Sequence, residues 1–356
     1  MSVRRFVVAW LVISIACASC ASHSTNDATA PPDAGDARAI SEASSVDGAV
    51  VDVAKSDAST FDGPRTLAET GLYSDLEAGT LADGVIPYEV RYELWADGAS
   101  KSRYLWLPPG TKIDTADMDN WVFPIGTKVW KEFRVAGRRI ETRFLHKRGE
   151  GDGGWIMIAY AWSADGTHAD AVPDGVVGAL GTTHDIPDTL ACTSCHGGVR
   201  DALNGVSAFQ LSAADGHGAL SRLSADGRLS SPPASEFQVP GTGTVQAALG
   251  YLHANCGHCH NDTSFLAKTH ALRLRLRVAD VTPESTTIYT TAIDAPMAHT
   301  WDGGPNVAVA PGSPEGSQLF YRMGRRDGYG MPPVGSRIVD DAALVTIRAW
   351  ISGLPH

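Results

Sequence analysis

Two copies of one short cysteine pattern constrain this chain more than any other feature. Residues 190–198 read LACTSCHGG and residues 251–261 read YLHANCGHCHN, so the pattern Cys-x-x-Cys-His occurs twice. The chain has 6 cysteines, and all of them except Cys17 and Cys20 belong to these motifs. The fold must therefore present both motifs to whatever their side chains bind.

Three chemistries use a Cys-x-x-Cys pair. Zinc needs two pairs, but Cys195 and Cys256 lie much farther apart than the roughly 15–20 residues usual in zinc ribbons. A thioredoxin-like redox pair needs a βαβ setting, which neither copy has. Covalent haem attachment explains the whole pattern, because two thiols bond the haem vinyl groups and the adjacent histidine ligates the iron. We predict two covalently bound haem c groups, one held by Cys192, Cys195 and His196 and the other by Cys256, Cys259 and His260.

The N-terminus predicts export. A basic start precedes the apolar run Phe6–Ala16, which is followed by small residues and cysteine. This is the pattern of a secretory signal, and it is too short to span a membrane. Two alternatives stay open: residues 1–20 are an ordinary cleaved signal peptide, or Cys17 or Cys20 carries a lipid. We expect the protein in the periplasm, or attached through an N-terminal lipid to the envelope membrane.

Residues 21–65 are rich in Ala, Ser, Asp, Thr and Pro. Such a segment cannot bury enough apolar surface to offset its ordering entropy, so we expect a disordered tether. The formal net charge of the chain is -11. This acidity argues against a nucleic-acid partner.

Residues 66–190 have the pattern of an antiparallel β domain. TKVWKEFRV (127–135) alternates, with Val129, Lys131, Phe133 and Val135 on one face, and Ala136-Gly137 predicts a hairpin turn. The following RRIETRFLH places Ile140, Thr142 and Phe144 inward, and WIMIAYAW (155–162) suits a central strand. We expect a small sheet with one covered face. Lys131 is either a lysine at the sheet edge with its head in solvent, or a lysine of a haem pocket.

Residues 245–356 have a helical pattern. A helix from Val245 runs directly into Cys256, and Ser313 with Pro314 predicts the start of a second helix. Asp340 is expected to cap a final amphipathic helix. The whole chain is therefore expected to be α+β, with the sheet first and the helices after it.

Met331 is the expected sixth ligand of the second haem. It lies in the loop DGYGMPPVG, where glycines allow close approach to a flat ring and prolines stiffen the backbone. Met323 falls on the expected helix from Pro314 and is expected to pack in the core. His258, inside the second motif, is expected to face solvent.

Residues 245–356 resemble a class I cytochrome c domain. The resemblance lies in the helix that enters Cys-x-x-Cys-His, the Met-Pro-Pro loop and the final amphipathic helix. It implies ligation by His260 and Met331, a crossing of the first and last helices, and an electron-transfer role. FPIGTKVWKEF and GGWIMIAYAW, between residues 100 and 200, weakly resemble β-type cytochromes c′ and their hydroxylamine-oxidising relatives, whose haem is crosslinked to lysine.

The first haem has a different setting. Residues 191–244 form its attachment segment, which is polar, contains no methionine and is too short for a complete helical cytochrome. We expect this segment to pack on the β domain, whose strand face with Val129, Lys131 and Phe133 roofs a five-coordinate or weakly ligated iron. His146, His168, His184 and His217 are each able to supply a sixth ligand, but none has a distinctive setting and each is expected at the surface.

The sequence thus predicts a dihaem c-type cytochrome that transfers electrons in the bacterial envelope, with envelope redox proteins as partners. The alternative is an oxidoreductase that converts a small molecule at an open first haem and uses the second haem as an electron relay. A dihaem peroxidase would be mostly helical, so the β region counts against it. Whether the chain is an enzyme stays open at this point.

Overall fold

The computed structural model describes residues 61–297, 300 and 303–356, which belong to one compact unit, Phe61–His356. The predicted signal peptide, Cys17, Cys20 and most of the predicted tether lie outside the described residues. Where the description begins, the chain already contacts the sheet, since the amide of Ala171 donates to the carbonyl of Arg65 over 2.9 Å. No helix in these ranges is long and apolar enough to cross a bilayer.

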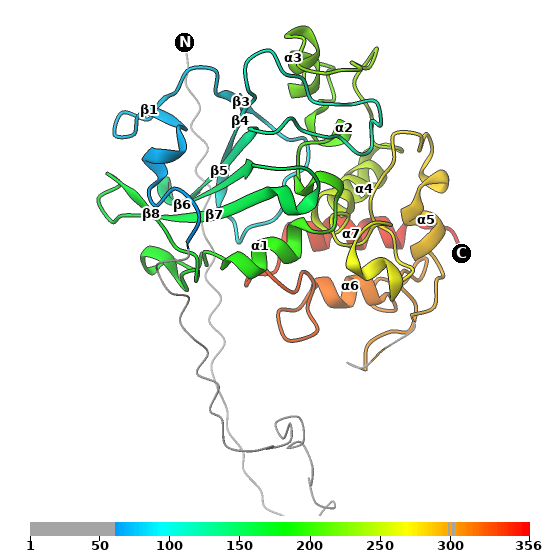
Figure 1. The fold of residues 1–356 in the computed structure, drawn as a ribbon. Coiled ribbons are helices and arrows are strands. Elements are labelled where there is room, and N and C mark those ends of the chain that lie inside the picture. Colours follow the sequence, from blue (N-terminus) through cyan, green and yellow to red (C-terminus); the bar gives the residue numbers. More distant parts are fainter. Residues whose placement is uncertain (1–60, 298–299, 301–302) are drawn as a thin grey trace, which may run out of the picture. The chain divides into compact units, whose positions relative to one another are not determined.

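A six-stranded antiparallel sheet forms the first half of the unit, and its strands lie side by side in chain order (Figure 1). Helices follow the strands in the chain, so the predicted α+β class is confirmed. The strands are β3 (Ile86–Tyr88), β4 (Ser100–Trp106), β5 (Lys128–Val135), β6 (Arg138–Lys147), β7 (Trp155–Trp162) and β8 (Ala169–Ala171).

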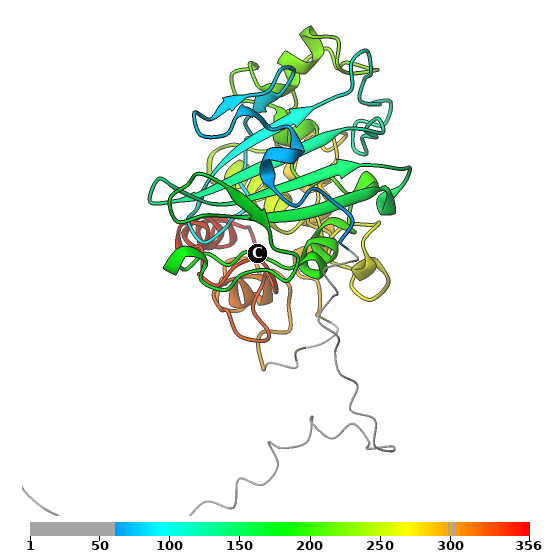
Figure 2. The ribbon, with the colours of Figure 1, turned by 60° about the vertical axis from the view of Figure 1, so that its left-hand side comes forward.

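Both faces of this sheet are covered, so the expectation of one covered face was wrong. On one face Leu67, in the short helix η1 (Leu67–Thr70), packs in a cluster with Trp130 and Phe144, and Figure 2 shows this blue segment lying against the strands. On the other face Val129 packs with residues that follow the first cysteine motif, such as Leu203. The chain after that motif therefore completes the core of the β domain.

A bulge between β5 and β6 decides which side chains share a face. Ala136 and Gly137 form the predicted turn, with φ of 49° and 80°, as a two-residue hairpin requires. The register then shifts by one residue between Phe133 and Arg134, so that Lys131 lies opposite Arg143. Since a shift of one residue turns side chains to the other face, Thr142 and Phe144 lie on the opposite face from Lys131. Thr142 and Phe144 thus lie on the opposite face from the other predicted inward set, whereas Ile140, at the bulge, packs in a cluster with Val135.

The helical half is built around two helices that contact each other, α4 (Gly243–Asn255) and α7 (Asp341–Ser352). The Asp340 side chain accepts from the amide of Ala343, which confirms the predicted cap. The other helices are α1 (Thr189–His196), α2 (Ala208–Leu211), α3 (Ala219–Ala225), α5 (Thr287–Ala292) and α6 (Gln318–Met323).

Two boundaries differ from the predictions. Helix α6 begins after Ser317, not after Ser313, because residues 313–317 close hydrogen-bonded turns from Gly316 and Ser317 back to Ser313 and Pro314. The predicted boundary between residues 190 and 191 falls inside α1.

Candidate functional site

The first motif lies on a helix that is one wall of a cleft. Asp188 caps helix α1, because its side chain accepts a 2.7 Å hydrogen bond from the amide of Ala191. Cys192 and Cys195 stand three residues apart, so their side chains leave the same side of the helix. Both cysteines and His196 line the cleft. The two attachment cysteines and the ligating histidine predicted for the first haem therefore lie on one wall.

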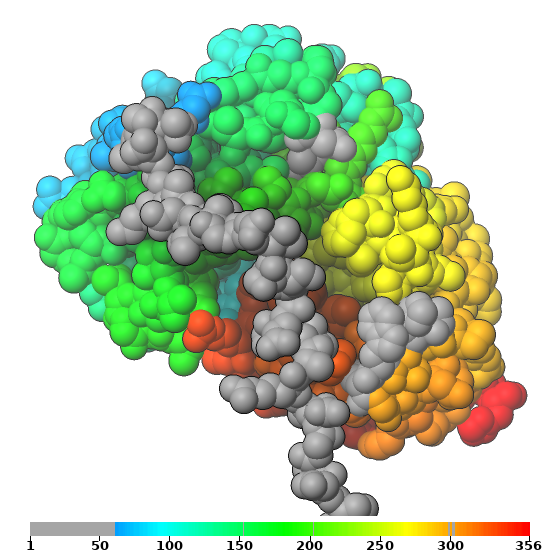
Figure 3. Space-filling model, turned by 60° about the horizontal axis from the view of Figure 1, so that its bottom comes forward, coloured from blue at the N-terminus to red at the C-terminus, as the bar shows by residue number. Residues whose placement is uncertain are grey.

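The opposite wall is the sheet, and we call the space between them the sheet cleft. The first motif faces this sheet. In the space-filling view, green and orange parts of the chain lie next to each other (Figure 3). The sheet cleft is partly open to solvent, and its empty space, counted together with that open part, is about 1150 Å³. Its sheet wall consists of residues on β5, β6 and β7, among them Val129, Lys131, Phe133, Arg143, Leu145 and Met157.

A buried ion pair ties the chain after α1 to the sheet. The ammonium of Lys147, on β6, lies 2.7 Å from the carboxylate of Asp201, and both side chains are almost fully buried. The same carboxylate accepts hydrogen bonds from the amide of Phe123 and from the indole of Trp155, at 2.6 and 3.0 Å. These contacts hold the first motif over the strands.

The second motif follows α4 without a break. The amide of Cys256 still donates to the carbonyl of Leu252, at 2.9 Å, and the carbonyl of His260 accepts from the amide of Leu274, at 2.8 Å. A side chain at Gly257 would lie 2.6 Å from the carbonyl oxygen of His253, so only glycine fits between α4 and the segment after the motif. The motif is thus packed tightly against the helical core.

The environment of His260 shows whether its side chain suits a haem ligand at the second motif. Its Nδ1 is buried and makes no hydrogen bond to any residue that the structure describes. Burial lowers the pKa of His260 to about 4, so the ring is neutral, which is the state that ligates a metal. Histidines that ligate metals usually donate their second N–H to a carbonyl or carboxylate. The backbone of Leu272 lies close to the His260 ring, where it favours the protonated ring and opposes part of the lowering of the His260 pKa. The residues present fit a proximal ligand.

The two motifs touch although they lie far apart in the sequence. Gly198 lies two residues after His196 and packs closely on the second motif. A Cβ added at Gly198 would lie 2.1 Å from the carbonyl oxygen of His258. The hydroxyl of Thr263 donates to the carbonyl of Gly198 over 3.0 Å. The two attachment segments are therefore joined directly.

His258 does not face solvent, which corrects the prediction. It is partly buried and lines both the sheet cleft and a neighbouring polar pocket. Burial, together with the charge of Lys131, lowers the pKa of His258 to about 4. A residue of the second motif therefore lies beside the first.

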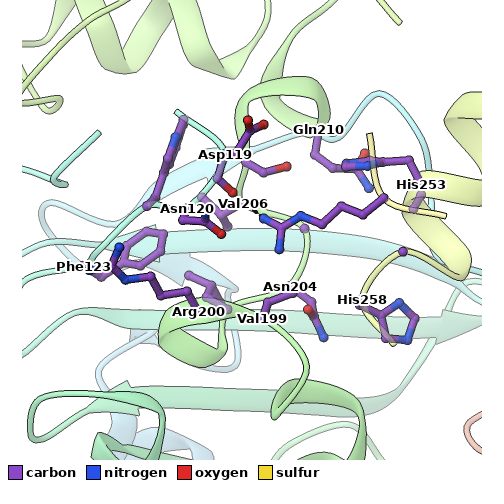
Figure 4. Close-up of a pocket in the computed structure, with 17 residues that line it drawn as sticks. Asp119, Asn120, Phe123, Val199, Arg200, Asn204, Val206, Gln210, His253 and His258 are labelled. Carbon is purple, nitrogen blue, oxygen red and sulfur yellow. Dashed lines mark hydrogen bonds between the residues drawn. The ribbon is translucent and has the colours of Figure 1, made fainter. Parts of the chain in front are cut away.

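The polar pocket lies next to the sheet cleft and shares Leu203, Asn204 and His258 with it. Figure 4 shows Asn204 and His258 at its lower edge and Asp119 and Asn120 across from them. Two buried polar atoms, Nε1 of Trp121 and Oδ1 of Asn204, make no hydrogen bond to any described residue. The pocket can therefore hold ordered water beside the first motif.

The four motif cysteines form no disulfide. Burial raises the pKa of the thiols, to about 12 for Cys256 and about 11 for Cys192 and Cys259, so none is an activated thiolate. Within the described ranges, no three or more His, Cys, Asp and Glu side chains gather as a metal site would need. The geometry therefore does not favour the zinc or thiol-redox alternatives.

Met331, the predicted sixth ligand of the second haem, lies in the loop that joins α6 to α7. The amide of Met331 donates to the carbonyl of Arg322 at the end of α6, at 2.9 Å, while Pro332 and Val334 line the sheet cleft. Met323 is buried in the helical core, as expected. Met331 stays a prediction for the second haem.

Sequence reasoning missed two side chains and, besides His258, misplaced a second histidine. Met157 lies in the sheet cleft, but it precedes the first motif, so a search of residues 191–244 could not find it. Arg143 shares the cleft because of the bulge. His184 is buried, not at the surface, and its Nε2 lies 2.7 Å from the carboxylate of Glu141.

Compared with known proteins, the chain matches no family model, no curated protein and no solved structure.

Proposed function

We propose that this chain is a dihaem c-type cytochrome that transfers electrons in the bacterial envelope, exchanging them with redox proteins there. The direct contact of the two motifs, through Gly198, His258 and Thr263, carries the proposal. A pair of haems that only needed separate environments would not require their attachment segments to touch. Electron exchange between them does require closeness.

The chain's own residues have distinct roles in this proposal. Cys192, Cys195, Cys256 and Cys259 fix the two groups covalently, and His196 and His260 ligate the irons. Once attached, each haem supplies an iron that gains and loses one electron. The sheet excludes water from the first site through Val129, Phe133 and Leu145, which line the cleft.

A second candidate is an oxidoreductase that acts on a small molecule at the first haem. The observation that favours it is that the sheet cleft beside Cys192, Cys195 and His196 is partly open to solvent. Two side chains in the cleft argue against a fully open iron, because Met157 and His258 are both able to ligate it. The coordination of the first iron decides between a carrier and an enzyme.

A stoichiometric reduction experiment tests electron transfer. Oxidised, haem-loaded protein receives one electron per molecule, and absorbance is followed at bands assigned with a reference variant, Cys192→Ala/Cys195→Ala, which keeps only the second haem. We expect the electron to settle mainly on the haem with the higher potential and then to pass to added oxidised soluble cytochrome c. If the reduced protein passes no electron to the added cytochrome c, the carrier function is wrong.

A further inference from the structure

Three cations stand in one row across the sheet. Arg103 on β4 lies opposite Lys131 on β5, and Lys131 lies opposite Arg143 on β6. Residues directly opposite in an antiparallel pair have Cβ atoms about 4.5–5.5 Å apart on the same face, and like charges there are destabilising. The row therefore needs negative charge nearby.

The protein itself supplies only part of that charge. Glu141 binds Arg143 through two hydrogen bonds of 2.6 and 3.1 Å, and Glu93 accepts from Arg103 at 3.1 Å. Nη2 of Arg103 is buried and makes no hydrogen bond to a described residue. The two arginines of the row thus each have a carboxylate as a partner, whereas Lys131 has none among the described residues that binds it directly.

Lys131, at the centre of the row, lacks a partner within the described part of the chain. Its ammonium lies over the ring of Phe133, 5.3 Å from the centroid. Burial and the charges of Arg103, Arg143 and Lys101 hold the pKa of Lys131 well below its usual value. On β6, by contrast, the buried Lys147 has Asp201 at 2.7 Å. The Lys131 side chain is partly buried. A cation held largely away from water without a partner is costly, and an anion would offset that cost.

Lys131 does not lie at a sheet edge. Strand β5 is paired on both sides, so the ammonium cannot leave the sheet sideways, as an edge lysine would. It faces the sheet cleft instead, together with Arg143 and both cysteines of the first motif. The unpaired charge therefore points to the space where a ligand beside the first haem would lie.

We propose that Lys131 and Arg143 form an anion-binding site in the sheet cleft, which takes a carboxylate or a small oxyanion. An ammonium and a guanidinium together make short, charge-assisted hydrogen bonds with such groups. The anion has two sources: a free anion from solution, or a propionate of the first haem. Only the second source rests on the proposed function.

Calorimetry of the haem-loaded, oxidised protein with sodium nitrite tests the site at low ionic strength. Lys131→Met removes the charge, and Lys131→Arg keeps it. Lys128→Met is the matched control, because Lys128 lies on the same strand but on the other face, where it donates to the carbonyl of Thr70 over 2.9 Å. Haem content is measured separately by pyridine haemochrome, so failed haem attachment is not mistaken for a failed anion site.

For a free anion, we expect nitrite to bind the wild type, with affinity lowered about ten-fold or more in Lys131→Met. Binding should persist in Lys131→Arg and in Lys128→Met. For a propionate, nitrite does not bind, but Lys131→Met makes the midpoint potential of the first haem depend on pH, since the released carboxylate then titrates. If Lys131→Met matches the wild type in both nitrite affinity and the pH dependence of the potential, the proposal is overturned.

Discussion

The two motifs have the same five-residue pattern but different supports. The second motif continues a long helix, α4, which contacts α7 within one helical core. The first lies on the short helix α1 and depends on strands that precede it in the chain. One motif thus has a local support, and the other uses a sheet.

The different supports indicate different roles for the two haems. The tight fit around Gly257 and the buried Nδ1 of His260 favour a fixed ligand set at the second motif. The sheet cleft adds charge, through Lys131 and Arg143, and leaves space. We therefore expect the second haem to be a carrier, and the first to respond to small ligands. The following predictions test this contrast, ordered by their expected cost to stability.

Asp201→Asn should have the largest effect. It removes the buried partner of Lys147 and leaves the exposed carboxylate of Glu150, 3.8 Å away, as its ion-pair partner. Breaking a buried ion pair costs about 3–5 kcal/mol, and the change releases the first motif from the sheet. Chemical denaturation of the haem-loaded protein measures the loss, with the exposed Asp83→Asn as control. Equal stabilities of the two variants would mean that this ion pair does not support the first motif.

His253 should make the helical half sensitive to acid. Burial, with the nearby charge of Arg275, lowers the pKa of His253 to about 3, and Nδ1 accepts from the amide of Leu276 at 3.0 Å. The unfolded chain binds this proton below about pH 6.5, so stability should fall by about 1.4 kcal/mol per pH unit from there towards the folded pKa. Denaturation between pH 4 and 7 should show a shallower slope for His253→Gln, but not for the exposed His217→Gln. An unchanged slope in His253→Gln would assign the acid sensitivity to other groups.

Gly198→Ala breaks the contact between the two motifs. The new methyl group would overlap the carbonyl oxygen of His258, and such overpacking costs about 1–3 kcal/mol. Electron exchange between the haems should become slower, as flash reduction would measure. Gly153→Ala is the matched control, because a Cβ there meets nothing within 4 Å. Unchanged exchange in Gly198→Ala would remove the support for direct transfer.

Met331→Ala should cost the least, about 1 kcal/mol or less, because the side chain is partly exposed in a loop. It should nevertheless remove the weak long-wavelength absorption of a Met–iron bond and lower the potential of the second haem. Met323→Ala should keep the band while losing about 2–5 kcal/mol of stability from the core. Loss of the band in Met323→Ala alone would reassign the ligand.

The sequence predicted the local features of this fold well. The turn at Ala136-Gly137, the cap at Asp340 and the helix that enters Cys256 each depend on a few neighbouring residues. It could not predict the bulge, because an unbroken register from that turn would place Lys131 opposite Thr142 rather than Arg143. The contact of Gly198 with His258 depends on the packing of both halves, and no local pattern encodes it.

The mass of the exported protein, matured in a host that attaches haem c, tests the central claim most directly. We predict two covalent haem additions in the wild type and one in either Cys192→Ala/Cys195→Ala or Cys256→Ala/Cys259→Ala. Protein that carries no haem, or that retains zinc at the cysteines in its place, would contradict the account.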